Sequence, residues 1–134
     1  MRDDIAMPLS AKEKLRRFYD QFTGNDQVLV VINADPDAIA SAMAIRRLLW
    51  RRVSGVTISS VNTIDRPDNL AMLRRLGVTL IPFAELDPNQ FSRFVIVDSQ
   101  PDHNRPMSEL SPSVIIDHHP DTKPEAPYVD IRPN

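Results

Sequence analysis

The stretch QVLVVINADPDAIASAMAIRRLL, residues 27–49, decides the fold. Its apolar run from Val28 to Ile32 is too short for a helix and rich in β-branched residues, which is typical of a strand buried on both faces. An acidic loop, residues 33–37, follows, and from Ala38 to about Val53 apolar residues recur at helical spacing. We therefore predict a buried strand that leads directly into a helix.

The same alternation continues along the chain. Further strands are predicted at residues 56–61, 78–81, 94–97 and 114–116, with helices at 67–76 and 87–92 and an extended segment near 128–131. Strands that alternate with helices form parallel sheets with right-handed crossovers. The sequence thus predicts an α/β fold: a doubly wound, mainly parallel sheet of about five strands with helices on both faces.

An amphipathic helix is predicted before this alternation begins. Ser10 and Glu13 have the spacing of a capping box, and aromatic residues follow at helical spacing up to Gly24. We expect a single domain, with this N-terminal helix in residues 1–24 and the α/β domain in residues 25–134. Gly24, Gly55 and Gly77 each follow a predicted helix, where a left-handed residue often closes the last turn.

Composition excludes several classes of protein. The chain has 134 residues and a net charge of −2, so it is no strongly basic protein that coats nucleic acid. Only three glycines are present, which excludes the glycine-rich loops that cradle phosphates. The absence of cysteine excludes thiolate metal sites, and no apolar run approaches the roughly 20 residues that span a bilayer. We expect a cytoplasmic protein with no membrane partner.

Acidic residues and histidines follow three of the predicted strands. Because the carboxyl ends of parallel strands meet at one edge of a sheet, we expect these side chains to converge. Carboxylates mixed with imidazoles suit Mn²⁺ or a similar divalent ion, and a pair of such ions can activate water against a phosphoryl group. The residues expected to converge are Asp35, Asp37, Asp98, His118 and His119.

Other charged residues have simpler interpretations. His103, Asp102, Asp121 and Asp130 are expected in solvated loops. The basic patch at residues 46–52, RRLLWRR, is interpreted as a solvated helix face that complements the helix dipole. Contact with a partner or a polyanion is the alternative interpretation of this patch.

Four segments, in this order, resemble motifs of the DHH phosphoesterase family: ADPDAIASAMAI (34–45), RPDNLAMLRRLGV (66–78), VIVDSQP (95–101) and VIIDHHP (114–120). The resemblance implies a doubly wound parallel sheet and a binuclear Mn²⁺ site, with Mg²⁺ or Co²⁺ as alternative ions. Members of the family hydrolyse phosphoanhydrides or phosphodiesters. The substrates implied are pyrophosphate, polyphosphate, short oligonucleotides or cyclic dinucleotides, and a homodimer is an expected assembly.

The resemblance also implies residue roles. Asp35 and Asp37 would each hold one metal, Asp98 would bridge both, and His118 would complete the second site. His119 would face the phosphate, with Asp117 supporting the histidines.

Two departures from the family pattern bear on activity. Family members carry a metal-binding histidine four or two residues before the first aspartate, and these positions hold Val31 and Asn33 here. Asn33 offers only a neutral carbonyl as a weak ligand, so the first metal site should be weakened or lost. The family's fourth-motif aspartate and C-terminal substrate-binding domain would lie beyond Asn134, so we expect the chemistry to belong to a longer protein.

Two alternatives stay open. In one, the chain is a catalytically degenerate regulatory module with the DHH fold, which binds a metal or a nucleotide. In the other, Asp35 is the nucleophile of a haloacid-dehalogenase-like phosphatase. The second alternative gives the DHHP segment no role, and no matching lysine is evident.

Overall fold

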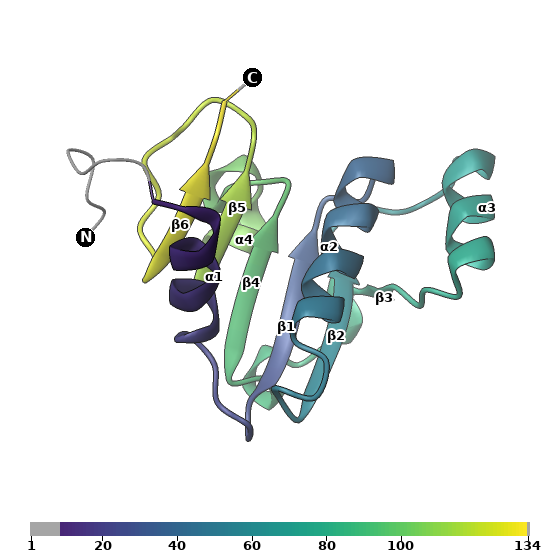
Figure 1. The fold of residues 1–134 in the computed structure, drawn as a ribbon. Helices are drawn as coiled ribbons and strands as arrows, with labels where there is room; N and C mark the ends of the chain where they lie inside the picture. Colours follow the sequence, from purple (N-terminus) through teal and green to yellow (C-terminus); the bar gives the residue numbers. More distant parts are fainter. Residues whose placement is uncertain (1–8, 134) are drawn as a thin grey trace.

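The computed structural model describes residues 9–133. All six strands are parallel and form one sheet in the order β3-β2-β1-β4-β5-β6 (Figure 1). The strands are β1 (Gln27–Ile32), β2 (Gly55–Ser60), β3 (Ile81–Pro82), β4 (Arg93–Val97), β5 (Val114–Asp117) and β6 (Tyr128–Ile131). The helices are α1 (Ala11–Tyr19), α2 (Pro36–Leu48), α3 (Pro67–Leu76) and α4 (Arg105–Ser108), with 3₁₀ turns at Phe83–Glu85, Pro88–Gln90 and Pro101–His103.

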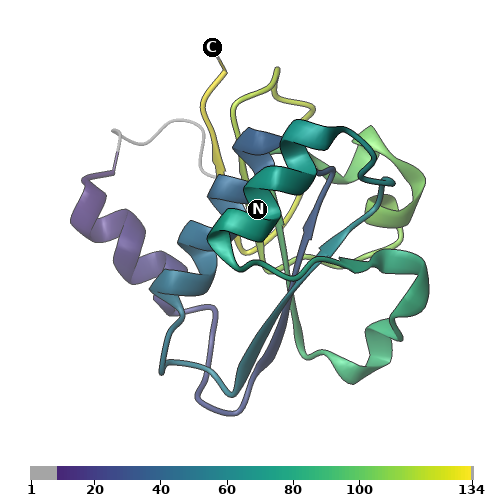
Figure 2. The same ribbon diagram turned by 90° about the vertical axis from the view of Figure 1, so that its right-hand side faces the viewer.

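The predicted α/β fold is confirmed, with six strands where we predicted about five. The strand order reverses its direction between β1 and β4, and in doubly wound sheets ligands bind at such a point, beyond the carboxyl ends of the strands. Figure 2 shows α1 and α2 on one side of the sheet and α4 with the 3₁₀ turns on the other. No helix among residues 9–133 is long and apolar enough to cross a membrane.

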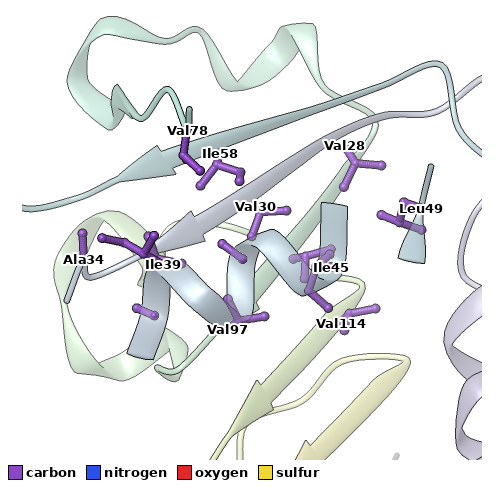
Figure 3. Close-up of a cluster of buried hydrophobic side chains, with 14 of the residues drawn as sticks. Val28, Val30, Ala34, Ile39, Ile45, Leu49, Ile58, Val78, Val97 and Val114 are labelled. Carbon is purple, nitrogen blue, oxygen red and sulfur yellow. The ribbon is translucent and has the colours of Figure 1, made fainter. Parts of the chain in front are cut away.

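The larger core lies under α1 and α2 (Figure 3). Alternate residues of β1 pack there against apolar residues of α2, such as Ile39 and Ile45. Phe18 joins α1 to the far edge of the sheet, since its ring lies edge-on to Tyr128 of β6 at 6.1 Å. Residues 9–24 therefore share a core with the sheet. The first eight residues of the predicted N-terminal segment lie outside the described part.

A smaller core lies on the opposite face. Val31 of β1 and Ile96 of β4 are buried there against Met107 of α4. Because both faces of β1 are covered, all five residues from Val28 to Ile32 are fully buried, as the continuous apolar run predicts.

The glycine prediction holds at one position of three. Gly77 ends α3 with a left-handed backbone, φ 63°. Gly55 instead opens β2, and the left-handed residue after α2 is Arg51, φ 63°. Gly24 also has no positive φ. The prediction was wrong at Gly24 and Gly55 because their preceding helices end earlier than the apolar pattern suggested, at Tyr19 and Leu48.

Two other boundaries differ from the prediction. The strand predicted at 78–81 is reduced to β3, an edge strand that pairs with two residues of β2 and includes Pro82, which has no N–H to donate. The helix predicted at 87–92 is a single 3₁₀ turn capped by Asp87. At the first helix Ser10 accepts the Glu13 N–H at 3.1 Å, but the Glu13 carboxylate turns to Arg16 and does not complete the capping box.

Candidate metal centre

A compact group of acids and imidazoles lies at the carboxyl ends of β4 and β5. Asp98, Asp117, His118 and His119 each offer one ligand atom, and these four atoms lie within 4.8 Å of one another. We call this group the Asp/His cluster. Parallel pairing of β4 with β5 brings the two strand ends together, so residues separated by about twenty positions in sequence meet here.

The backbone of Asp98 has a left-handed conformation. Its φ is 58°, and its N–H donates to the Ile116 carbonyl at 2.9 Å, which continues the β4–β5 pairing. Its side chain is only 5% exposed, and Oδ1 lies 2.5 Å from Nε2 of His118. Burial raises the pKa of the Asp98 carboxyl and the charge of Asp35 adds to the rise, although the contact with His118 opposes it. A cation at this point would offset the cost of ionising the buried carboxyl.

Asp117 is held from two sides. Its Oδ2 accepts a hydrogen bond from Nε2 of Gln100 at 2.7 Å, and its Oδ1 lies 2.7 Å from Nδ1 of His119. Burial opposes ionisation, but the bonds from Gln100, His119 and the His118 backbone outweigh it and lower the pKa of Asp117. Asp117 is therefore a buried carboxylate whose two oxygens are already occupied by hydrogen-bond donors.

The pKa of His119 is raised, whereas that of Asp117 is lowered. The hydrogen bond to Asp117 raises the pKa of His119; partial burial opposes the rise, and the charges of Asp117, Asp98 and Asp35 reinforce it. Its ring stacks on His118 with centroids 4.5 Å apart. The side chain is 44% exposed, so the imidazole is fixed through Nδ1 and still reachable from solvent.

Gln100 links the cluster to the following loops and was given no role by sequence reasoning. It is fully buried, and its amide N–H₂ also donates to the Pro120 carbonyl at 3.0 Å. Its Oε1 accepts from both the backbone N–H and the hydroxyl of Thr122, at 2.8 and 2.7 Å. The only sequence signal was its position two residues after Asp98, in the segment VIVDSQP.

His103 also lies at this site. Its side chain is exposed, as expected for a loop residue, but its ring is edge-on to His119 at 5.6 Å. Its Nδ1 accepts the Gln100 N–H at 3.1 Å. His103 is solvated as expected, but nothing in the sequence indicated these two contacts, which arise because the 3₁₀ turn after Gln100 folds the residue back onto the cluster.

The polar residues of the loop after β1 lie outside the Asp/His cluster. Asp35 is exposed and caps α2, with Oδ1 accepting the Ala38 N–H at 2.8 Å, yet its charge acts on Asp98 and His119. Asp37 lies in the first turn of α2 and is exposed, as is Asn33. These three residues lie outside the group of four whose ligand atoms converge.

Asn62, which sequence reasoning also missed, fixes that loop. Its Oδ1 accepts the Ala34 N–H at 2.6 Å, and its Nδ2 donates to the Ala34 carbonyl at 3.0 Å. The loops after β1 and β2 are thus joined by a two-point bridge directly before Asp35.

The three acids expected in loops lie in different settings. Asp102 is exposed, and its Oδ1 lies 2.8 Å from the Thr122 hydroxyl, whose one proton it shares with Gln100 Oε1 as the alternative acceptor. Asp121 lies beside Lys123 in the loop after β5. Asp130, however, lies within β6 and pairs with Lys14 of α1 at 3.4 Å, so its assignment to a loop was wrong.

Comparison with known proteins gives one relative. The chain is 35% identical over 106 residues to the uncharacterized protein MJ1633 of Methanocaldococcus jannaschii. The match covers 79% of this chain and 22% of the relative, so the chain spans about a fifth of the length of the curated relative it matches. No protein-family model and no solved structure matches the chain.

Proposed function

We propose that the chain is part of a metal-dependent phosphohydrolase of the DHH phosphoesterase type, which hydrolyses phosphoanhydride or phosphodiester bonds. The observation that carries the proposal is the convergence of Asp98 with the Asp117–His119 triplet at two adjacent strand ends. The proposed substrates are pyrophosphate, polyphosphate, short oligonucleotides and cyclic dinucleotides. The proposed setting is the cytoplasm, and a homodimer is the proposed assembly.

The donor set of the Asp/His cluster fits a divalent transition ion. Two carboxylates and two imidazoles suit Mn²⁺ better than Ca²⁺, which takes oxygen ligands alone. Asp98 and His118 are the proposed direct ligands, because both oxygens of Asp117 already accept hydrogen bonds. Asp35 and Asp37 are further proposed ligands, one for each of two ions.

The chain's own residues would act on the phosphate around such ions. A bound ion would supply Lewis acidity toward a phosphoryl oxygen and lower the pKa of water. His119, held through Nδ1 and with a raised pKa, would present its Nε2–H to a phosphoryl oxygen and stabilise charge that develops there. The N-terminus of α2, which follows Asp35 directly, adds a favourable dipole for the same anion.

One observation favours a second candidate, a degenerate module that binds a metal or nucleotide without turnover. The two positions where the family has a metal-binding histidine hold Val31, fully buried in the smaller core, and Asn33, an exposed amide. Neither side chain is an imidazole. Binding would then persist through the Asp/His cluster while hydrolysis would not.

The test combines metal binding with hydrolysis. Calorimetric titration with Mn²⁺ is expected to show binding that weakens at least tenfold in Asp98→Asn, because asparagine tolerates the left-handed backbone but lacks the charge. Hydrolysis of pyrophosphate, polyphosphate, a dinucleotide and a cyclic dinucleotide is assayed with the same samples. Binding that is unaffected in Asp98→Asn would reject the proposed centre, and binding without turnover of any substrate would favour the degenerate module.

Asp37 and Asp68 provide a matched pair for the second ion. Each follows a proline at the start of a helix, Asp37 in α2 and Asp68 in α3, and both are exposed. Both substitutions to asparagine remove the same favourable interaction with a helix dipole. If Asp37 holds an ion, only Asp37→Asn lowers the Mn²⁺ stoichiometry; equal behaviour of the two variants would remove Asp37 from the ligand set.

A further inference from the structure

A concave surface lies at the end of α2 that is remote from the Asp/His cluster. It is a cavity of about 730 Å³, within the range of roughly 300–1,000 Å³ that is usual for small-molecule sites. Its walls come from the C-terminal half of α2, the following turn and the start of β2, and we call it the Arg/Trp cavity. Its lining includes Arg46, Arg47, Trp50 and Arg51.

The Arg/Trp cavity is distinct from the Asp/His cluster. Parallel strands place the start of β2 at the opposite end of the sheet from the strand ends that carry Asp98 and Asp117. Arg46 lies ten residues after Pro36, which places it about 15 Å along α2 from the capped N-terminus, at 1.5 Å per residue. Ligand binding in this cavity therefore does not depend on the proposed function.

The charge of the cavity is strongly positive. Arg46, Arg47 and Arg51 line it, and no acid among residues 9–133 does. Within residues 9–133 none of these three guanidinium groups forms an ion pair. The chain as a whole has a net charge of −2, so this is a local concentration of cations that favours an anionic ligand.

An aromatic ring stands beside these cations. Trp50 is the chain's single tryptophan and is 66% exposed, and the Arg51 guanidinium lies 6.0 Å from its ring. Arg52, by contrast, is already placed over Tyr19 at 3.7 Å and does not line the cavity. Complementing the helix dipole accounts for Arg46 and Arg47 in the last turn of α2, but it explains neither Arg51 beyond the helix nor an exposed indole.

We propose that the Arg/Trp cavity binds a phosphorylated nucleoside, with the base stacked on Trp50 and the phosphate held by Arg47 and Arg51. Guanidinium groups bind phosphate through two parallel hydrogen bonds, and indole rings stack on bases of any sequence. The same chemistry serves a free nucleotide and a nucleotide within a single strand. A separate arm of the experiment distinguishes these two sources.

The fluorescence of Trp50 reports binding directly, since the chain has no other indole. Titrations are carried out in EDTA, so that no divalent ion loads the Asp/His cluster. AMP is expected to change the emission saturably and to bind at least tenfold more tightly than adenosine or inorganic phosphate alone. The absence of AMP binding, checked by calorimetry in case the emission is insensitive, would overturn the proposal.

Two double variants test the role of the arginines. Arg47→Gln with Arg51→Gln is expected to weaken AMP binding at least tenfold. The matched control is Arg74→Gln with Arg75→Gln, which removes two exposed arginines from the last turn of α3 and the same total charge. The control is expected to bind AMP within twofold of the unaltered chain; equal weakening by both double variants would contradict a specific site.

The third arm compares AMP with a single-stranded hexadeoxyadenylate. Equal affinity per site would assign the cavity to a free nucleotide. Tighter binding of the hexamer, with a steep dependence on salt concentration, would assign it to a strand that extends past the cavity. Either result requires that Trp50→Leu, followed by calorimetry, reduces affinity to that of inorganic phosphate; a variant that still prefers AMP would remove the stacking role.

Discussion

Gln100 donates its side-chain amide to Asp117 at 2.7 Å from a position with no solvent exposure. The other Asp117 oxygen contacts His119, so a neutral amide in one loop fixes the orientation of an imidazole that follows the next strand. Gln100 also accepts two hydrogen bonds from Thr122, so it holds the loop after β5 in place beside the cluster. The geometry of the Asp/His cluster thus depends on a residue that offers no ligand of its own.

Replacing Gln100 by alanine is expected to destabilise the fold and to weaken metal binding. The substitution leaves the buried Asp117 carboxylate and Thr122 without a shared partner, and an unsatisfied buried group costs about 1–3 kcal/mol. Urea denaturation measures the free energy of unfolding, and calorimetry measures the affinity for Mn²⁺. Gln90→Ala, at an exposed glutamine in a 3₁₀ turn, is the control and is expected to be neutral. A neutral Gln100→Ala would show that the loop does not depend on this amide.

Much of the fold follows from local patterns in the sequence. The continuous apolar runs at β1, β4 and β5 correspond to buried strands, because a short run that is apolar throughout has no polar face to turn toward solvent. The third strand shows the limit of this reasoning. Val78 is buried against the larger core, yet it lies before β3 and outside the pairing. An apolar pattern reports burial, whereas pairing also depends on where the neighbouring strand ends.

The candidate site was predictable to the extent that its residues follow strands. Asp98, His118 and His119 lie close together because parallel pairing aligns their strand ends, and Asp117 lies with them. Asp35 was expected among them, but its carboxylate also caps its own helix, and sequence alone cannot rank those two uses of one side chain. Gln100 and His103 were missed because their contacts depend on the path of a loop.

Gly77 and Gly24 allow the cost of a left-handed backbone to be measured alone. In the described part of the chain neither glycine has a neighbour within 4 Å of an added Cβ, but of the two Gly77 alone has a positive φ, 63°. Gly77→Ala is therefore expected to reduce the free energy of unfolding by about 1 kcal/mol, through backbone strain and without a clash. Gly24→Ala should be neutral or slightly stabilising. Thermal and urea unfolding compare the two, and equal effects would contradict a cost that arises from the backbone conformation.

Asp26 is expected to make the fold sensitive to acid. It is buried, which opposes ionisation, but its carboxylate accepts the Thr23 N–H and the Ser92 hydroxyl, both at 2.7 Å, and these bonds lower its pKa. The folded pKa lies below the unfolded value of about 3.9, so the stabilisation is complete above that value and is lost as pH falls through the folded pKa.

Asp26→Asn tests this dependence. It is expected to reduce the free energy of unfolding by about 1–3 kcal/mol at pH 7, because it removes a charged acceptor from two partly buried hydrogen bonds. The difference in free energy of unfolding between Asp26→Asn and the unaltered chain should become smaller when urea unfolding is repeated near pH 3. Asp20→Asn, at an exposed residue whose one ion pair within residues 9–133 is with Arg16, is the control and should change little at either pH. A difference that stays constant with pH would place the effect in packing instead of charge.

Under the proposed function, Val31 and Asn33 stand where the DHH phosphoesterase family carries a metal-binding histidine, and histidine substitutions at these two positions are expected to have different effects. Asn33 is exposed at the end of β1, beside the loop that carries Asp35, so Asn33→His places an imidazole where it can reach solvent and the neighbouring acids. Under the proposed function this variant should raise Mn²⁺ affinity or stoichiometry in calorimetry. Val31 lies in the smaller core with Ile96 and Met107, and Val31→His should instead cost about 2 kcal/mol or more, because an imidazole would be buried without a partner. Improved metal binding by Val31→His without loss of stability would contradict this assignment of the two positions.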